Sequence, residues 1–319
     1  VYAADNDVKV VQCALGTIDN NNFTQAALDY AYDKNVLVIT SMADENSRHH
    51  NMPAAANHTL PVHAIQYDGG SLKTSTTFMA FHPCSNFGGQ NLLSASGTAC
   101  SSEATGRFSG IAGLLYSAAK KYNVPLRPGE AASLFFTTAD DINVGESQEE
   151  GSIYQWSQSG FDQRFGYGRV NANRAIEALK DKKIPPSVDI TEPRWFSVLY
   201  KDQVEGPVDI VGTVSAPMAT SYDYVVEWGA GVQPLDGEFK VFKEMKNISP
   251  NVVAGSDEPL ASLEIRDLEI DNPPDRDSPY GENKYTITVR VRSTAHYGGT
   301  KGDVRGEMRR TYYVQSDPS

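Results

Sequence analysis

The order of apolar and polar residues divides the chain into two parts of different texture. In the first part, short apolar runs alternate with longer segments whose apolar residues recur at helical spacing. The predicted strands occupy residues 8–15, 36–43 and 61–68, and the predicted helices residues 23–34, 103–122, 127–142 and 169–183. Strands and helices that alternate with short connections form βαβ units, so this part predicts a doubly wound parallel sheet covered by helices, of the α/β class.

In the second part, only short β-rich runs occur, separated by Gly, Pro, Asp and Asn. The runs occupy residues 208–214, 223–229, 239–244, 262–268, 285–293 and 310–315. This spacing predicts a small all-β sandwich of the immunoglobulin or fibronectin type. We therefore predict two domains, residues 1–185 and residues 186–319.

The run at 285–292 alternates strictly between apolar and polar residues. Strict alternation predicts that one set of side chains faces a core and the other faces water. The set expected in the core is Tyr285, Ile287, Val289 and Val291, and the set expected in water is Thr286, Thr288, Arg290 and Arg292.

Composition and charge restrict the function. The 319 residues carry a net charge of −12, with a pI of about 5.0, and no part of the chain supplies the basic stripe that nucleic-acid binding requires. No apolar run is long enough to span a membrane. The sequence therefore predicts neither a nucleic-acid partner nor a membrane span.

The cysteines and the first residues give further expectations. Cys13, Cys84 and Cys100 are too few for a disulfide scaffold and match no zinc spacing. We expect buried free thiols, and a Cys84–Cys100 bridge stays open as the alternative. The chain begins with Val1 and almost at once enters a buried-strand pattern, from which we expect that upstream sequence is missing.

The stretch SASGTACSSEATGRFSGIAGLLYSAAKK, residues 94–121, is the strongest functional signal. A glycine turn and small hydroxylated residues at the start of a long helix can expose a side chain where backbone N–H groups favour negative charge. A helix cap formed by Ser101 or Ser102 is the alternative interpretation.

Several motifs, in the same order and spacing, resemble those of the subtilisin-like serine proteases. SGTACSSEATG resembles the nucleophile motif G-T-S-x-A-x-P: Gly97 and Thr98 match, and Ala99 stands where that family has its serine. The other similar segments are VQCALG, NVLVITSMADENS, CSNFG, TTADDI and GYGRVNANRAIEA. The resemblance covers residues 8–182.

The resemblance implies a serine endopeptidase with a Ser-His-Asp mechanism, in an inactive form because Ala99 has no nucleophilic hydroxyl. None of the six histidines is followed by glycine, so the catalytic Asp and His are expected on an upstream segment or a separate chain. The family is mostly secreted, which implies a secreted or periplasmic protein with a protein or peptide substrate. The residues implied to bind substrate are Ala14, Leu15, Gly16, Ser41, Met42 and Ala43.

Asp44 stands where the resemblance places the asparagine of the oxyanion hole. A carboxylate cannot donate a hydrogen bond to a developing oxyanion, as an amide does. Either Asp44 is protonated, which would favour activity at mildly acid pH, or another donor such as Asn46 serves. The remaining alternative is that Asp44 is a loop or capping residue.

The sequence contains two weaker candidate sites, a histidine pair and an acidic turn, and it leaves two competing functions open. The pair His49 and His50 is interpreted as a solvated loop. The acidic turn with Asp271, Asp275, Asp277 and Glu282 fits a hairpin loop better than a calcium site, so no cofactor is predicted. The competing functions are a natural pseudoprotease that binds a peptide or protein, and an adhesion or carbohydrate-binding protein that acts through the β-sandwich.

Overall fold

The computed structural model describes residues 1–19, 21–48, 50–67, 78–143, 157–268, 270, 285–299 and 302–316. His49 and the acidic turn at 271–282 lie outside these residues. Contacts divide the chain into two compact units, Val1–Lys182 and Lys183–Ser319. Within the described residues, no helix combines the length and the apolar character needed to cross a bilayer.

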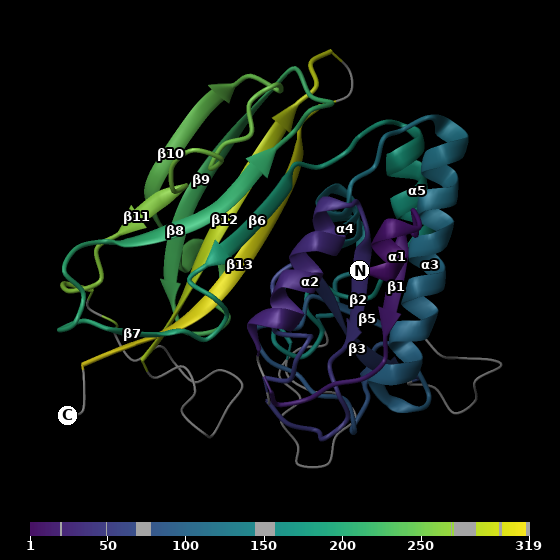
Figure 1. Ribbon diagram of the computed structural model, residues 1–319, viewed down its shortest axis with the longest axis horizontal. Coiled ribbons are helices and arrows are strands. Elements are labelled where there is room, and N and C mark those ends of the chain that lie inside the picture. The colour runs from purple at the N-terminus through teal and green to yellow at the C-terminus, as the bar shows by residue number, and fades with distance from the viewer. Residues whose placement is uncertain are drawn as a thin grey trace. The chain divides into compact units, whose positions relative to one another are not determined.

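The first unit is built on a parallel sheet (Figure 1). Its strands are β1 (Val10–Cys13), β2 (Leu37–Ser41), β3 (Thr59–Gln66), β4 (Ala80–Phe81) and β5 (Leu93–Ser96). β1, β2, β3 and β5 are parallel neighbours in that order, and only β4 pairs antiparallel, with the end of β3. Every residue of β2 is buried, as expected for a strand covered on both faces.

The helices of this unit are α1 (Tyr2–Asp5), α2 (Asn22–Asp33), α3 (Cys100–Tyr122), α4 (Pro128–Thr138) and α5 (Ala172–Lys180). α3 packs across β1, β2, β3 and β5, while α2 contacts β2, and Figure 1 shows α2 and α3 on either side of the strands. The predicted α/β class with a parallel sheet is confirmed.

Local signals explain the helix ends. The side chain of Asn21 accepts the backbone N–H of Thr24 and caps α2, and Asn35, just after α2, has the left-handed φ of 62° that stops a helix. Asn171 caps α5 in the same way as Asn21 caps α2. The start of α3 differs, because its N-cap residue is Ala99, which has no capping side chain.

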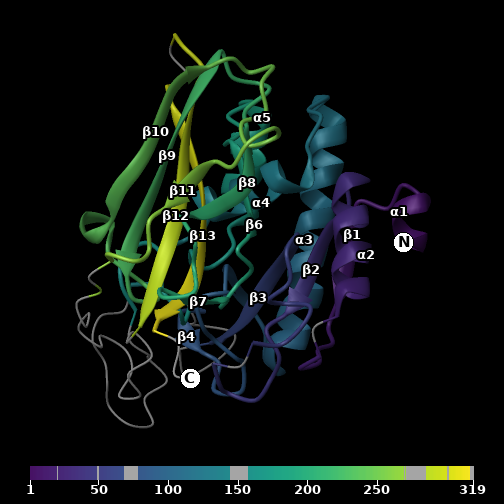
Figure 2. The ribbon, with the colours of Figure 1, turned by 60° about the vertical axis from the view of Figure 1, so that its left-hand side comes forward.

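The second unit, seen edge-on in Figure 2, contains a five-stranded sheet, β10-β9-β12-β13-β7, and a three-stranded sheet, β11-β8-β6. Its elements are β6 (Ser187–Glu192), β7 (Val198–Tyr200), β8 (Val208–Ser215), β9 (Ser221–Ala230), η1 (Asp236–Glu238), β10 (Lys240–Ile248), β11 (Ala261–Leu263), β12 (Thr286–His296) and β13 (Val304–Gln315). One buried cluster includes residues of both sheets. An all-β part thus follows the α/β part.

The prediction that one face of β12 meets water is wrong for three of its residues. Ile287, Val289 and Val291 lie in the core as expected, but the other face is covered too. Thr286, Thr288 and Arg290 are buried there, whereas Arg292 is half-buried and Tyr285 is exposed.

Arg290 tolerates this burial because its charge is paired. Its side chain is 1% exposed, its Nε donates to Glu227 at 2.6 Å, and its guanidinium lies 3.8 Å from the centre of the Phe239 ring. A central strand with a paired cation on its second face produces the same alternating sequence as a half-exposed strand.

The G-x-G segment before α5 is explained by close backbone contacts. Gly166 has a φ of 65°, and a Cβ there would lie 2.4 Å from the carbonyl carbon and oxygen of Leu92. Gly168 has a φ of 113°, and its Cβ would lie 2.3 Å from the carbonyl oxygen of Asp140. Only glycine lets this segment lie against β5 and the residues after α4.

The substitution Gly166→Ala should therefore destabilise the fold by about 3 kcal/mol or more, because it adds overlap with a backbone to the strain of a positive φ. Gly160→Ala is the matched control, since Gly160 has a φ of 82° and nothing within 4 Å of its Cβ position. It should lose only about 1–2 kcal/mol. Urea denaturation measures both, and equal losses would refute the close-contact explanation.

Candidate active site

A cleft of about 420 Å³ lies at the carboxyl ends of β1 and β2. Because these strands are parallel, with Cys13 level with Thr40, the segments that follow them meet at one edge of the sheet. The lining residues are Ala14, Leu15, Gly16, Thr17, Ile18, Ser41, Ala43, Asp44, Glu45, Asn51 and Ser102. The structure thus brings five of the six predicted substrate-binding residues together, while Met42 is buried.

The two predicted substrate segments differ in the state of their backbones. Within the described part of the chain, the backbone groups of Ala14, Leu15 and Gly16 form no hydrogen bond with other backbone groups, and Leu15 is 65% exposed. The carbonyl of Ala43, in contrast, accepts a hydrogen bond from the Asn86 N–H at 2.9 Å and lies 3.0 Å from the hydroxyl oxygen of Ser101. Only the first segment offers a strand edge to a ligand.

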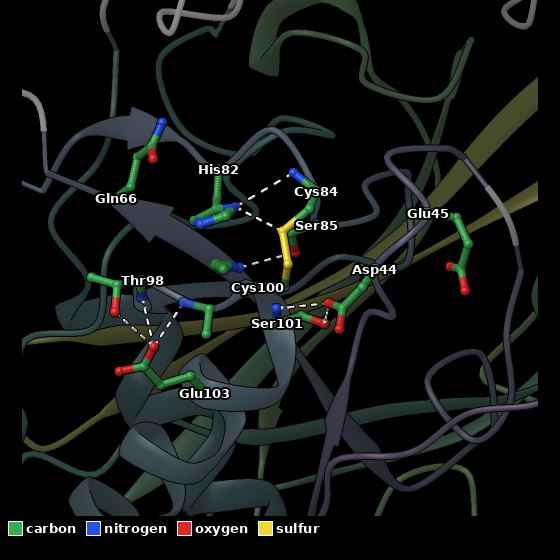
Figure 3. The surroundings of a disulfide bond; sticks show 12 residues. Asp44, Glu45, Gln66, His82, Cys84, Ser85, Thr98, Cys100, Ser101 and Glu103 are labelled. Atoms are coloured by element: carbon green, nitrogen blue, oxygen red, sulfur yellow. Dashed lines mark hydrogen bonds between the residues drawn. A yellow bond between two sulfur atoms is a disulfide. The ribbon is translucent and has the colours of Figure 1, made fainter.

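Asp44 accepts hydrogen bonds at the start of α3. Its Oδ1 receives the backbone N–H of Ser101 at 2.8 Å and the Ser101 hydroxyl at 2.6 Å (Figure 3). Ser101 is fully buried, and its Oγ also lies 2.5 Å from that of Ser41. This arrangement corresponds to the capping alternative for Asp44, with the carboxylate as acceptor. Asn46, the other candidate donor, is exposed, and its backbone N–H donates to the Cys84 carbonyl.

Ala99 is exposed, but its backbone N–H is already bonded. The Oε2 atom of Glu103 accepts hydrogen bonds from the N–H of Ala99 at 2.8 Å and from the N–H and hydroxyl of Thr98 at 2.7 and 3.0 Å (Figure 3). Its other oxygen pairs with Arg107. The N–H group that a nucleophile at position 99 would direct at an oxyanion is therefore held by a carboxylate of the same helix.

The pKa of Glu103 reflects these contacts. Partial burial by itself raises the pKa of Glu103, but the hydrogen bonds from Thr98 and Ala99, together with the charge of Arg107, outweigh it and lower the pKa. The contact is therefore fully formed above the ordinary pKa of a glutamate and is lost as the pH falls through the lowered value.

Cys84 and Cys100 form a disulfide with a Cα–Cα distance of 5.7 Å. The expectation of free thiols is therefore wrong for this pair and right for Cys13, which is free and half-buried, and whose pKa is raised by burial. Spacing alone did not indicate the bridge, since the two cysteines are 16 positions apart in the sequence and match no known motif. The bridge ties the start of α3 to the loop after β4.

The S-N-x-G segment after Cys84 contains Asn86, whose side chain binds the loop that carries Asp44. The Oδ1 atom of Asn86 accepts the N–H groups of Glu45 and Ser47 at 2.9 and 3.1 Å, and its Nδ2 donates to the Glu45 carboxylate at 2.6 Å. The buried amide thereby shapes the loop that carries Asp44.

The described histidines have other partners. The buried His63 contacts the Asn86 carbonyl, and burial lowers its pKa to about 3. His58 pairs with Asp29, and His296 lies in the second unit between Asp223 and Asp303. His82 lies beside the disulfide. The expectation of an upstream histidine base stays a prediction.

We predict that Asp44→Ala destabilises the first unit by about 0.5–2 kcal/mol, the usual loss when a helix N-terminus loses its capping acceptor. Asp44→Asn keeps an oxygen acceptor and should change stability by only a few tenths of a kcal/mol. Thermal and urea unfolding of the two variants test this. An Asn variant as unstable as the Ala variant would show that the charge, and not the acceptor, matters.

Comparison with known proteins identifies the family to which this sequence is similar. The sequence profile of the Subtilase family matches residues 1–168. Similar solved structures include the prenylagaramide maturation protease PagA (18% identity, TM-score 0.43, 56% of this chain and 64% of that one) and the self-cleaved protease domain of PatA (19%, 0.43, 56% and 65%). A lanthipeptide protease matches at 16% identity and a TM-score of 0.42, over 56% and 63% of the two chains.

No curated protein matches. The chain spans less than two thirds of the length of these three solved structures. The profile match covers more than half of the chain, in the unit that contains the cleft and the start of α3. The chain belongs to the subtilase family.

Proposed function

We propose that this chain carries the substrate cleft of a serine endopeptidase in which residue 99 is the position of the nucleophile, so that the Ala99 form binds a peptide without hydrolysing it. The observation that carries the proposal is the cleft between the segments after β1 and β2. An extended peptide would pair with the unbonded backbone of residues 14–16 and add a strand there. Leu15 and Ile18, 65% and 82% exposed, would contact its apolar side chains.

A serine at position 99 would lie where α3, 23 residues long, begins. The free N–H groups and the dipole at that end favour the negative charge that develops on a peptide carbonyl oxygen. Proton transfer from the serine would need a histidine base, oriented by an aspartate. We place these two residues on a partner segment, either upstream in the same polypeptide or on a separate chain.

The open edge of β1 supports a place for that segment. Among the described strands, β1 pairs only with β2, and its residues are exposed or half-buried. An apolar cavity of about 330 Å³ lies beside it, lined in part by Val1, Val11 and Cys13. A further parallel strand on this edge would bury these residues and bring its carboxyl end to the cleft.

Export to an oxidising compartment, secreted or periplasmic, forms part of this proposal. The Cys84–Cys100 disulfide supports it, because such bonds persist mainly outside the cytosol. We propose no resident cofactor for hydrolysis, since the family mechanism uses only side chains and backbone donors.

The test is the variant Ala99→Ser in the full-length protein, with its upstream segment, assayed on a denatured protein substrate between pH 4 and 9. We expect cleavage about 10⁴–10⁶ times faster than in the Ala99 form, because a nucleophile is restored. A fluorophosphonate should label residue 99 covalently in the variant only. A folded variant that neither cleaves nor reacts would refute the endopeptidase.

A second candidate is a pseudoprotease that binds peptides and has no hydrolytic role. The contact of Glu103 with the N–H of Ala99 favours it, because the group needed for an oxyanion hole is occupied in addition to the missing hydroxyl. For a carbohydrate or adhesion role of the second unit, no comparable observation exists among the described residues: Trp228 is buried, and the Tyr297 hydroxyl donates to the Ile184 carbonyl.

The substitution Glu103→Ala, combined with Ala99→Ser, distinguishes the two candidates. In an enzyme, release of the backbone N–H of residue 99 should raise kcat/KM above that of Ala99→Ser alone. Acid does not replace this substitution, because the histidine base becomes protonated at a higher pH than Glu103, whose pKa is lowered. Glu177→Ala, which removes an exposed carboxylate on α5, is the matched control. In a pseudoprotease, neither serine variant cleaves, while peptide affinity, measured by calorimetry, persists.

A further inference from the structure

A cluster of three metal-ligating side chains lies beside the candidate active site and has no part in the hydrolytic mechanism. It consists of His82, Cys84 and Cys100, whose Nδ1 and Sγ atoms all lie within 4.8 Å of one another (Figure 3). His82 is buried, and both cysteines are half-buried. We propose that, once the Cys84–Cys100 disulfide is reduced, these residues bind one Zn²⁺ ion.

The orientation of His82 is the first argument. Its Nδ1 lies 2.9 Å from Cys84 Sγ and 3.4 Å from the Cys84 backbone N–H, which donates to it. Nδ1 therefore presents a lone pair to the sulfur, and the ring proton belongs on Nε2. A disulfide sulfur has no proton to donate, so two electron-rich atoms face each other at short range. After reduction, the same lone pair can bind a cation that the two thiolates also bind.

The ligand set is the second argument. Two thiolates and one imidazole are ligands that zinc prefers, with Zn–S distances of about 2.3 Å and Zn–N distances of about 2.0–2.1 Å. Tetrahedral geometry separates two bound sulfurs by about 3.8 Å. Cys84 and Cys100 have a Cα–Cα distance of 5.7 Å, so side-chain rotation with small backbone shifts suffices to part the sulfurs.

Reduction of the disulfide precedes metal binding. A dithiol reductant transfers two electrons and two protons to the Cys84–Cys100 bond, which breaks to give two thiols while the reductant becomes a disulfide. Zn²⁺ then displaces one proton from each thiol into the solvent, and neutral His82 contributes its Nδ1 lone pair without losing a proton. The site is electrically neutral, with a fourth position for water or a ligand.

This site lies next to residue 99, because Cys100 follows it in the chain and begins α3. In the disulfide form, Cys100 has a left-handed φ of 57°. The disulfide and the zinc complex exclude each other, since both use the same two sulfurs. The redox state of the Cys84–Cys100 pair therefore determines whether the start of α3 carries a disulfide or a metal site.

The experiment uses the Cys13→Ser protein, so that the only thiols after reduction are Cys84 and Cys100. The protein is reduced, freed of reductant, checked for folding by circular dichroism, and titrated with Co²⁺ and then Zn²⁺. We expect the charge-transfer absorption of thiolate-bound tetrahedral Co²⁺, its loss on addition of one equivalent of Zn²⁺, and one zinc per chain by elemental analysis.

Two comparisons keep the outcome independent of folding and of peptidase activity. The oxidised form of the same protein should bind no metal at this site, and its fold is the one described above. His82→Ala should weaken zinc binding at least about tenfold in the reduced protein. The proposal is overturned if the reduced protein gives no thiolate absorption, or if His82→Ala binds zinc as tightly as its parent.

Discussion

The start of α3 depends on acceptors that its own N-cap residue does not supply. The first N–H groups of any helix have no partner within it, and Ala99 has no side-chain oxygen to offer. Asp44 from the loop after β2 and Glu103 from the helix itself take these hydrogen bonds. The disulfide adds a covalent link to the loop after β4. These three attachments hold the start of α3, where Ser102 lines the cleft.

Capping and the proposed catalysis require the same backbone N–H groups at this helix end. A free N–H stabilises an oxyanion only if no protein acceptor holds it in the resting state. Asp44 holds the N–H of Ser101, deeper in the helix, while Glu103 holds that of Ala99, where the reaction would occur. The contact of Asp44 with Ser101 is compatible with the proposed catalysis at residue 99. The contact of Glu103 with Ala99 must break before the N–H of residue 99 can bind an oxyanion. Breaking the contact between Glu103 and Ala99 costs little free energy, because Glu103 is partly exposed and water replaces the lost hydrogen bonds.

The sequence predicted those parts of the structure that rest on periodicity and chain order. Apolar runs and helical spacing suffice for β1, β2, β3 and α3, because burial on two faces leaves continuous apolar runs. Parallel order then brings Leu15 and Ser41 to one edge. Periodicity could not show the short strands β4 and β5, or the burial of Arg290, whose neutralising partner Glu227 lies on another strand. The role of Glu103 was missed because the matched motif has proline there.

The Cys84–Cys100 disulfide, which the sequence left open as an alternative to free thiols, also links the loops around the cleft. Asn86, two residues beyond Cys84, holds the N–H groups of Glu45 and Ser47 and so shapes the loop that carries Asp44. Asp44 in turn holds the helix that begins at Cys100. With the disulfide, these contacts form a closed ring that connects the loop after β4, the loop after β2 and the start of α3. A disulfide that closes such a ring restricts the chain beyond its own 16-residue loop, because it opposes the separation of every pair in the ring. The disulfide thus belongs to the same set of contacts as Asp44, which lines the cleft.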